Sequence, residues 1–481
     1  MDSRPLIAGD DMVRLLGPWR RRGPGYAALA ATLRSLVLDG RLPLRARLPS
    51  ERALAIALGV SRTTTTAAYD LLRDEGYVES RRGSGSHIAL PTGGAVDREV
   101  AGEEGPSTRQ GAIDLTIAAM PAPGAMMEAV SRASRDLTGF LGGSGYDPRG
   151  LPSLRRVVAN HFDERGLPTS EDQIVITSGA QHALTLLLQV LVAPGDPVLL
   201  EEPSYPNAFE AMRRAHARFV PAAMRDDGWD VEMMASLWRT AVPRLAYLIC
   251  DFQNPTGFLM TDDERAAVVA AAARAGSHVI VDETFAQIDL EPWRTTPRPL
   301  AAHDREGRVI SIGSMSKAYW GGLRVGWIRC TTALAHRLAR ARAGLDLSTP
   351  VLEQLVAEHL LRMGESVLAE RRGLLTSRRD ALVGALHRDL PAWRFRLPRG
   401  GLCLWAELGG PDAEALVYAA DAGGVRLIPG STFSVDGTLN RRVRLPYTQP
   451  ANALEEAVVR LAAADRRLRL GAGGPTDQSM V

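Results

Sequence analysis

Lysine occurs once in this 481-residue chain, at Lys317, among 57 basic residues of which the other 56 are arginine. Arginine stays cationic in proteins, whereas a desolvated lysine amine can lose its proton and attack a carbonyl carbon. A composition so biased toward arginine could also leave one lysine on the surface by chance. The residues around Lys317 therefore decide between a chemical role and a stray surface charge.

Those neighbours favour a chemical role. An apolar run over residues 309–312 predicts a strand, and Ser314, Ser316 and Lys317 follow it in a hydroxyl-rich turn. Arg324 comes seven residues after the lysine. A lysine beside serines and an arginine suits a Schiff-base amine next to a phosphate-binding cluster, which is the arrangement that pyridoxal 5′-phosphate requires.

Further polar residues stand where predicted strands end. Ala180 and Gln181 follow a strand and a glycine and begin a predicted helix, whose first backbone amides can bind a phosphate ester. Tyr205 could stack on a ring, Asn254 presents an amide, and the Asp282 carboxylate could keep a pyridine nitrogen protonated. Taken singly, each also fits a packed loop tyrosine, an ordinary turn or a helix cap. Their joint occurrence favours one cofactor site.

The elements that would position these residues alternate between strands and helices. Predicted strands cover residues 174–177, 198–201, 245–250, 279–282, 309–312 and 325–328. Such alternation predicts an α/β fold with a mostly parallel sheet covered by helices. After about residue 349, a long arginine-rich helical stretch precedes β-like pieces at 402–407, 425–428 and 443–445. This order predicts a smaller α+β domain.

The N-terminal part differs in charge from the rest of the chain. Residues 12–90 contain thirteen arginines and six acidic residues, a local charge of +7, and the whole chain carries +2, which leaves about −5 elsewhere. A basic domain favours a polyanionic partner. Residues 91–111 are rich in glycine, proline and acidic residues and predict a linker. We therefore expect domains at 12–90 and 112–470.

The basic domain has helix-turn-helix spacing. Ser50 is a predicted N-cap of a short helix that stops at Gly59, and Ser61 caps a second helix a few residues later. Residues 75–88 alternate around a glycine-rich tip and predict a basic β-wing. A small helical bundle with solvated arginines is the alternative.

This segment resembles the winged helix of GntR-type bacterial transcription regulators. The resemblance rests on Leu-Pro-Ser-Glu-Arg, Leu-Gly-Val-Ser-Arg-Thr-Thr, Glu-Gly-Tyr and Gly-Ser-Gly, over some 60 residues. It implies that double-stranded operator DNA is contacted by Arg52, Ser61, Arg62, Thr63 and Thr64, with Arg82 and Gly83 at the wing tip. Thr66 stands where some relatives have an arginine, so one contact is expected to be absent.

Residues 112–470 resemble the aspartate-aminotransferase-like fold, fold type I of the pyridoxal phosphate enzymes. The resemblance implies that Lys317 forms the Schiff base and that Arg444 clamps the carboxylate of an effector. It also implies a cofactor-binding set of Tyr146, Ala180, Gln181, Tyr205, Asn254, Asp282, Ser314, Ser316, Lys317 and Arg324, in which Tyr146 reaches the phosphate of a partner subunit. Phe285 departs from the pattern. Many aminotransferases have a tyrosine there that donates to the ring hydroxyl, and phenylalanine cannot donate.

A GntR-type winged helix joined to such a domain looks like the MocR subfamily. That resemblance implies a transcription regulator that responds to pyridoxal 5′-phosphate or to an amino compound such as γ-aminobutyrate or taurine, as a domain-swapped homodimer. A working aminotransferase with a secondary DNA module, or a DNA-binding scaffold with an empty pocket, are the alternatives. Three scattered cysteines and the lack of metal-ligand spacing or an apolar span predict a cytoplasmic protein without metal.

Overall fold

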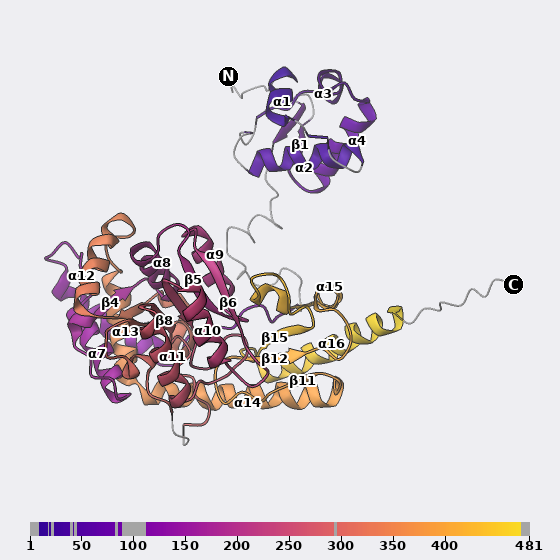
Figure 1. Ribbon diagram of the computed structural model, residues 1–481. Helices are drawn as coiled ribbons and strands as arrows, with labels where there is room; N and C mark the ends of the chain where they lie inside the picture. Colours follow the sequence, from indigo (N-terminus) through magenta and orange to yellow (C-terminus); the bar gives the residue numbers. More distant parts are fainter. Residues whose placement is uncertain are drawn as a thin grey trace. The chain divides into compact units, whose positions relative to one another are not determined.

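Two hydrophobic cores form in the structure, one in each of the units into which the chain divides. This computed structural model describes residues 9–17, 19–20, 24–38, 42, 46–81, 85–88, 112–292 and 296–472. The units are Met1–Gln110 and Gly111–Val481 (Figure 1). The predicted linker at 91–111 and the wing-tip residues Arg82 and Gly83 lie outside the described residues.

The N-terminal unit packs helices against a two-stranded hairpin. Its elements are α1 (Gly9–Leu16), α2 (Gly25–Leu38), α3 (Glu51–Leu58), α4 (Arg62–Asp74), β1 (Val78–Arg81) and β2 (Gly85–Ile88). The Ser50 Oγ accepts from Ala53 N at 3.2 Å, and the Ser61 Oγ accepts from Thr64 N at 3.2 Å. Gly59 ends α3 at φ +62°, a conformation that glycine adopts without steric cost. The predicted caps and stop are confirmed, whereas α1 was not predicted.

A seven-stranded sheet organises the larger part of the C-terminal unit. Its order is β4-β10-β9-β8-β7-β5-β6, and β10 alone runs antiparallel to its neighbours. The strands are β4 (Ile174–Thr177), β5 (Pro197–Glu202), β6 (Arg218–Ala223), β7 (Leu245–Leu248), β8 (His278–Asp282), β9 (Val309–Ser314) and β10 (Gly326–Arg329). The parallel strands end at one edge of the sheet, where ligands bind in such folds.

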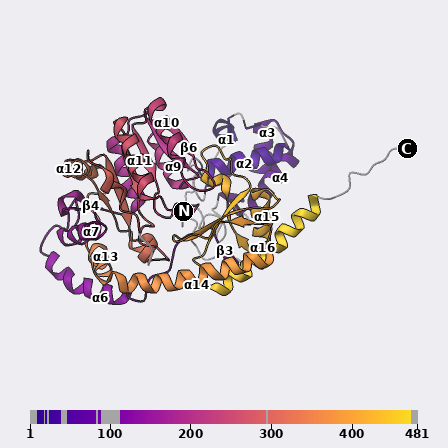
Figure 2. The same cartoon turned by 60° about the horizontal axis from the view of Figure 1, so that its bottom comes forward.

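Helices surround this sheet and join it to the smaller part. They are α6 (Met126–Asp136), α7 (Pro152–Glu164), α8 (Ala180–Leu191), α9 (Pro206–Arg214), α10 (Val231–Ala241), α11 (Asp262–Arg274), α12 (Thr332–Ala341), α13 (Val351–Met363), α14 (Glu365–Asp389), α15 (Ala413–Ala422) and α16 (Ala451–Ala472). The long α14 extends from the region of α13 to the small sheet, where it packs beside α16 (Figure 2).

The smaller part contains a four-stranded sheet of order β11-β12-β15-β14. Its strands are β11 (Arg394–Phe395), β12 (Cys403–Glu407), β14 (Ile428–Pro429) and β15 (Arg442–Pro446), and a separate parallel pair joins β3 (Ile113–Asp114) to β13 (Val425–Arg426). The single β-like piece predicted at 425–428 is therefore wrong. Leu427, which is 5% exposed, separates two strands that pair with different partners.

Short helical turns complete the unit. They are η1 (Leu137–Phe140), η2 (Glu171–Gln173), η3 (Leu300–His303), η4 (Ser316–Trp320), η5 (Gly321–Leu323), η6 (Arg342–Gly344) and η7 (Gly430–Phe433). Of these, η4 is a π-helical turn that follows β9 directly and carries the lysine. Among the described residues, no helix has the length and apolar character needed to cross a bilayer.

Candidate functional site

A group of hydrogen-bond donors lies where β4, β9 and β10 meet α8. Gly326 on β10 lies opposite both Thr177 at the end of β4 and Ser314 at the end of β9, so these two ends flank one point. The helix α8 begins at Ala180, and no described side chain caps its N-terminus. The first amides of a helix lack intrahelical acceptors and attract anions.

Arg324 and two serines stand beside that helix end. The Arg324 Nη2 donates to Ser178 O at 3.2 Å, and the Ser314 and Ser316 hydroxyls lie 2.8 Å apart. A Cβ added at Gly179, which has φ +91°, would lie 2.9 Å from Arg324 Nη2. The turn thus requires glycine both for its backbone angle and for the close approach of the guanidinium. Backbone amides, hydroxyls and a cation together make a donor set that suits a phosphate ester.

Lys317 extends from η4 toward the N-terminal segment of the unit. Its Nζ donates to Ala118 O at 2.8 Å and lies 6.0 Å from the centroid of the Phe285 ring. Phe285 is 6% exposed. The structure therefore places the amine next to the ring that the sequence identified as a departure from the aminotransferase pattern.

Asp282 is buried at the end of β8 with both carboxylate oxygens engaged. Its Oδ1 accepts from Thr284 N at 2.9 Å, and its Oδ2 accepts from Tyr247 Oη at 2.8 Å. Burial, followed by the charge of Asp282, raises the pKa of Tyr247 well above its usual value, so the phenol keeps its proton and donates. Sequence analysis missed Tyr247, although a hydroxyl in an otherwise apolar strand signals a buried partner.

Asn254 lies in a turn after β7, and Arg444, on β15 of the small sheet, reaches it. The Arg444 Nη1 donates to Asn254 Oδ1 at 3.4 Å, and its Nη2 donates to Thr116 O. The guanidinium carbon lies 5.0 Å from the centroid of the Phe433 ring. Arg444 is 7% exposed, and its buried Nε has no hydrogen-bond partner among the described residues. A buried cation with an unused donor is suited to an anionic ligand.

Tyr205 and Gln181 are connected through Asn207, which sequence analysis also missed. The Asn207 Nδ2 donates to Tyr205 Oη at 2.9 Å, and the Gln181 Nε2 donates to Asn207 O at 3.1 Å. The Gln181 Oε1 is buried without a partner among the described residues. Burial raises the pKa of Tyr205. Asn207, two residues after the tyrosine, fixes the loop of Tyr205 against the start of α8.

A buried carboxylate holds two of the site loops together. The Glu201 Oε1 accepts from Ile249 N and from Gln253 Nε2, both at 3.0 Å, and its Oε2 accepts from Trp229 Nε1 at 2.6 Å. The same Gln253 amide donates to Pro203 O at 2.7 Å. Burial raises the pKa of Glu201 to about 8, against the three donors that lower it. Glu201 thereby positions the segments that carry Tyr205 and Asn254.

Tyr146 is not gathered with the other predicted cofactor residues. Its side chain is 67% exposed, and its backbone N donates to Ser144 Oγ at 3.4 Å. Nine predicted residues, from Ala180 to Arg324, lie at strand ends or the helix start described above, and Tyr146 lies on the surface. Among the described residues, no cluster of histidine, cysteine and acidic side chains could hold a metal ion.

The predicted DNA-contacting residues outside the wing lie on α3 and at the start of α4, a surface here called the helix-turn-helix face. Arg52, Ser61, Arg62 and Thr63 are exposed, while Thr64 is half-buried and shares a 2.8 Å hydrogen bond with the Ser61 hydroxyl. Thr64 therefore also stabilises the beginning of the helix. The predicted contacts Arg82 and Gly83 lie outside the described residues.

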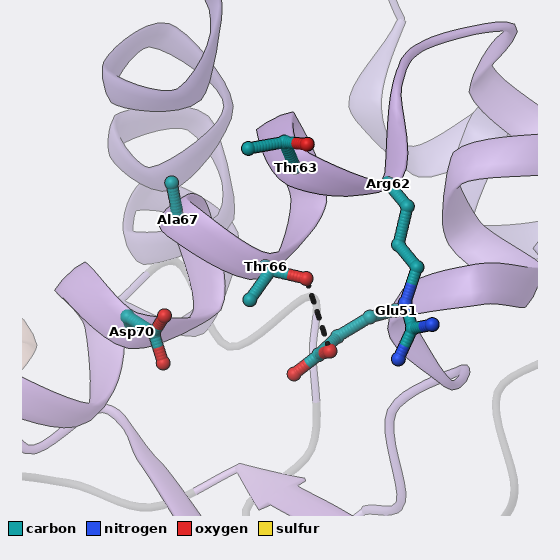
Figure 3. Close-up of a pocket in the computed structure, with 6 residues that line it drawn as sticks. All are labelled: Glu51, Arg62, Thr63, Thr66, Ala67 and Asp70. Atoms are coloured by element: carbon teal, nitrogen blue, oxygen red, sulfur yellow. Dashed lines mark hydrogen bonds between the residues drawn. The ribbon is translucent and has the colours of Figure 1, made fainter.

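A shallow pocket lies on this face, lined by Glu51, Arg62, Thr63, Thr66, Ala67 and Asp70 (Figure 3). Thr66 Oγ1 donates to Glu51 Oε2 at 3.1 Å, and Arg73 Nη2 donates to Glu51 Oε1 at 2.7 Å. The threonine that replaces an arginine of some relatives is thus bound to Glu51 within the unit.

A match to a protein-family model shows which family the larger unit belongs to. Residues 113–461 match the model of "Aminotransferase class I and II". The chain belongs to the aminotransferase class I and II family. Residues 25–88 of this family member match "Bacterial regulatory proteins, gntR family". The predicted combination of a GntR-type helix-turn-helix with an aminotransferase-type domain, which is the MocR-type architecture, is confirmed.

Relatives of this aminotransferase-family chain include proteins that carry regulator names. The "Uncharacterized HTH-type transcriptional regulator YisV" of Bacillus subtilis is 27% identical over 93% of this chain and 97% of its own length. The probable rhizopine catabolism regulatory protein MocR of Rhizobium meliloti is 29% identical over 77% of this chain and 78% of its own length.

A solved structure supports the fold of the larger unit. The α-aminoadipate aminotransferase LysN of Thermus thermophilus, crystallised with N-(5′-phosphopyridoxyl)-L-leucine, matches with a TM-score of 0.68 and 30% identity. The match covers 76% of this chain and 96% of LysN. The predicted α/β fold class is confirmed.

Proposed function

We propose that the chain is a transcription regulator whose winged helix binds operator DNA and whose aminotransferase-type unit holds pyridoxal 5′-phosphate. The observation that carries the proposal is the position of Lys317, the single lysine, directly after β9 and between Ser316 and the Arg324 turn. Since operator DNA is its partner, we place the protein in the cytoplasm. The regulator names of two relatives support the same conclusion.

The residues present fit this cofactor. A phosphate ester accepts hydrogen bonds only, and the α8 amides, the hydroxyls of Ser314 and Ser316, and Arg324 all donate. A Cβ at Gly179 would occupy the approach of the Arg324 guanidinium. For the cofactor ring, Asp282 would supply a buried carboxylate to a protonated ring nitrogen, and Asn254 would supply an amide to the ring hydroxyl.

In this proposal the protein's own groups bind and orient. Lys317 would hold the cofactor through its amine, and Tyr205 would lie against the cofactor ring. Tyr247 holds the Asp282 carboxylate in place through its 2.8 Å hydrogen bond. When bound, the pyridoxal group supplies an electron sink. Arg444 binds the carboxylate of an amino-compound effector, since its buried guanidinium can form two parallel hydrogen bonds.

Phe285 favours sensing over turnover. Its ring stands 6.0 Å from Lys317 Nζ, and it offers no hydroxyl to a ring oxygen. An aminotransferase with an appended DNA-binding module remains the second candidate, because Lys317, Asp282, Asn254 and Arg444 are all retained. Fast keto-acid-dependent turnover would favour that candidate.

A homodimer is part of the proposal. Tyr146 is 67% exposed, and we assign its hydroxyl to the phosphate bound by a partner subunit. We propose further that each DNA-binding unit docks on the opposite subunit, as in a domain-swapped homodimer. Sedimentation of the full-length chain with and without Tyr146→Ala tests the pairing and its dependence on cofactor.

Borohydride trapping tests the cofactor assignment. The full-length protein is incubated with pyridoxal 5′-phosphate, reduced, digested and mapped by mass spectrometry. We expect a single adduct on the peptide that contains Lys317, and we expect none in Lys317→Arg, which keeps the positive charge. An adduct on the N-terminal amine, with none on Lys317, would show that the pocket does not hold the cofactor as proposed.

A further inference from the structure

A segment of the C-terminal unit already bonds to the two cations that we assign to ligands. This segment, residues 114–121, is here called the strap. The Lys317 Nζ donates to Ala118 O at 2.8 Å, and the Arg444 Nη2 donates to Thr116 O. The strap thus presents backbone carbonyl oxygens to the amine assigned to the cofactor and to the guanidinium assigned to the effector carboxylate.

Other side chains fasten the same strap. The Thr448 Oγ1 donates to Ile117 O at 3.3 Å, and the Gln449 Nε2 donates to Asp114 O at 3.1 Å. From α14, Arg371 donates to Pro121 O at 2.5 Å, and Arg378 Nη1 lies 3.4 Å from Met120 Sδ. In these three bonds a strap carbonyl oxygen accepts and a side chain of the body of the unit donates, whereas Leu115 N of the strap donates to Arg426 O at 2.9 Å.

Ligand binding and strap binding compete at both cations. A carboxylate clamped by two parallel bonds uses one N–H of the arginine Nη2 together with either Nη1 or Nε. In this protein Thr116 O accepts from one of the two N–H groups of the Arg444 Nη2, so a carboxylate that binds through that N–H excludes the strap. At the lysine, condensation with an aldehyde turns an ammonium with three donors into an imine nitrogen with at most one N–H. The bond to Ala118 O is therefore weakened or lost when the cofactor is linked.

We propose that the strap is an internal competitor, which an amino-acid carboxylate displaces from Arg444 when it enters the cofactor-loaded site. The inference rests on the proposed function and specifies its regulation. The strap begins three residues after Gly111, where the chain divides into its two units.

Two probes and a pair of variants test the competition in the full-length protein. The probes are N-(5′-phosphopyridoxyl)-L-leucine and its counterpart without a carboxylate, N-(5′-phosphopyridoxyl)-isoamylamine. Thr448→Val removes the bond to Ile117 O without touching Lys317 or Arg444. Thr240→Val is the matched control, because the Thr240 Oγ1 bonds only within α10, to Ser236 O at 3.0 Å.

Calorimetry measures the affinity of each protein for each probe. Loss of one hydrogen bond that holds the strap should tighten binding of the leucine probe by about fivefold, the factor expected for an ordinary net hydrogen bond. The affinity for the isoamylamine probe should rise less, since this probe has no carboxylate that could bind Arg444. Thr240→Val should leave both affinities unchanged. Equal or weaker binding of the leucine probe by Thr448→Val would overturn the inference.

Thiol labelling supplies a second measurement that does not depend on the threonine variant. Met120 is 3% exposed, and the native Cys250, Cys330 and Cys403 are buried. Burial raises the pKa of these three thiols, so they react slowly. In Met120→Cys, the leucine probe should accelerate labelling of the strap by at least threefold, because displacement of the strap exposes the new thiol to the reagent.

The outcomes distinguish a failure of the proposed cofactor site from a failure of the strap proposal. If neither probe binds the wild-type protein, the proposed cofactor site itself fails. If the leucine probe binds but labelling at position 120 is unchanged or slowed, the cofactor site stands and the strap is not displaced.

Discussion

Tyr247 donates a 2.8 Å hydrogen bond to Asp282 in the buried interior of the larger sheet. The two residues lie on the neighbouring strands β7 and β8. Because burial and Asp282 both raise the pKa of Tyr247, the phenol remains a donor throughout the physiological range. The carboxylate that we assign to the cofactor ring is thereby held by the protein before any ligand contributes.

Tyr247→Phe should lower the free energy of unfolding of the cofactor-free protein by about 1.5–3 kcal/mol, because a buried carboxylate loses a donor. Pyridoxal 5′-phosphate should reduce this loss, since its ring nitrogen gives Asp282 a new partner. Tyr447→Phe is the control, because Tyr447 Oη donates at 3.1 Å to the neutral Gly400 O. Denaturant unfolding with and without cofactor measures both variants, and equal losses in all four conditions would refute the pairing.

Arg444→Gln should leave the absorbance of the cofactor-loaded protein nearly intact while raising the concentration of an amino-acid effector needed to shift it. The loss of charge-assisted hydrogen bonds corresponds to about 1.5–3 kcal/mol, or roughly 10- to 150-fold. Arg442→Gln, on the same strand, should respond like the wild type because Arg442 pairs with Asp226 at 3.0 Å. An unchanged effector requirement in Arg444→Gln would mean that the carboxylate is bound elsewhere.

Phe285→Tyr should speed formation of the pyridoxamine form from a bound amino acid, because the new hydroxyl can donate to the ring oxygen. The wild type should convert slowly or stop before release of product. Single-turnover absorbance with candidate amino acids measures both proteins. Phe395→Tyr, whose ring stacks on His387 in the small sheet, serves as the control. Fast multiple turnover by the wild type would instead support the aminotransferase alternative.

Arg52→Ala and Arg62→Ala should weaken DNA binding, since both side chains are exposed on the helix-turn-helix face. A lost phosphate contact should flatten the salt dependence by about one unit, and a lost base contact should cost ~1–3 kcal/mol and relax one operator position. Arg132→Ala, on α6 of the other unit, should bind normally. Unchanged operator binding by both N-terminal variants would remove these arginines from the interface.

Much of the fold follows from local sequence signals. Strand-helix alternation predicted the sheet, and Ser50, Gly59 and Ser61 predicted where two helices begin and end, because caps and left-handed glycines act through nearby backbone. The division at 425–428 was not predictable. The run is continuous in sequence, and its two strands differ only in their distant partners, β3 and β15.

The candidate site was predictable where residues follow strand ends. Asn254, Asp282 and Lys317 are of this kind, since parallel strands bring their carboxyl ends to one edge. Tyr247 and Asn207 were not found, because each acts through one other residue of the site. The contact of Lys317 with Ala118 joins positions 199 residues apart, and no local pattern encodes it. The roles assigned to these residues remain predictions.

The most direct test of the central claim is the DNA affinity of the full-length protein with and without pyridoxal 5′-phosphate, in the wild type and in Lys317→Ala. If the larger unit senses the cofactor through Lys317, the cofactor should change the wild-type affinity by about fivefold or more, the usual lower range of coupling between two sites. Lys317→Ala should show no such change. Identical wild-type affinities with and without cofactor, under conditions where the adduct on Lys317 is present, would contradict the account.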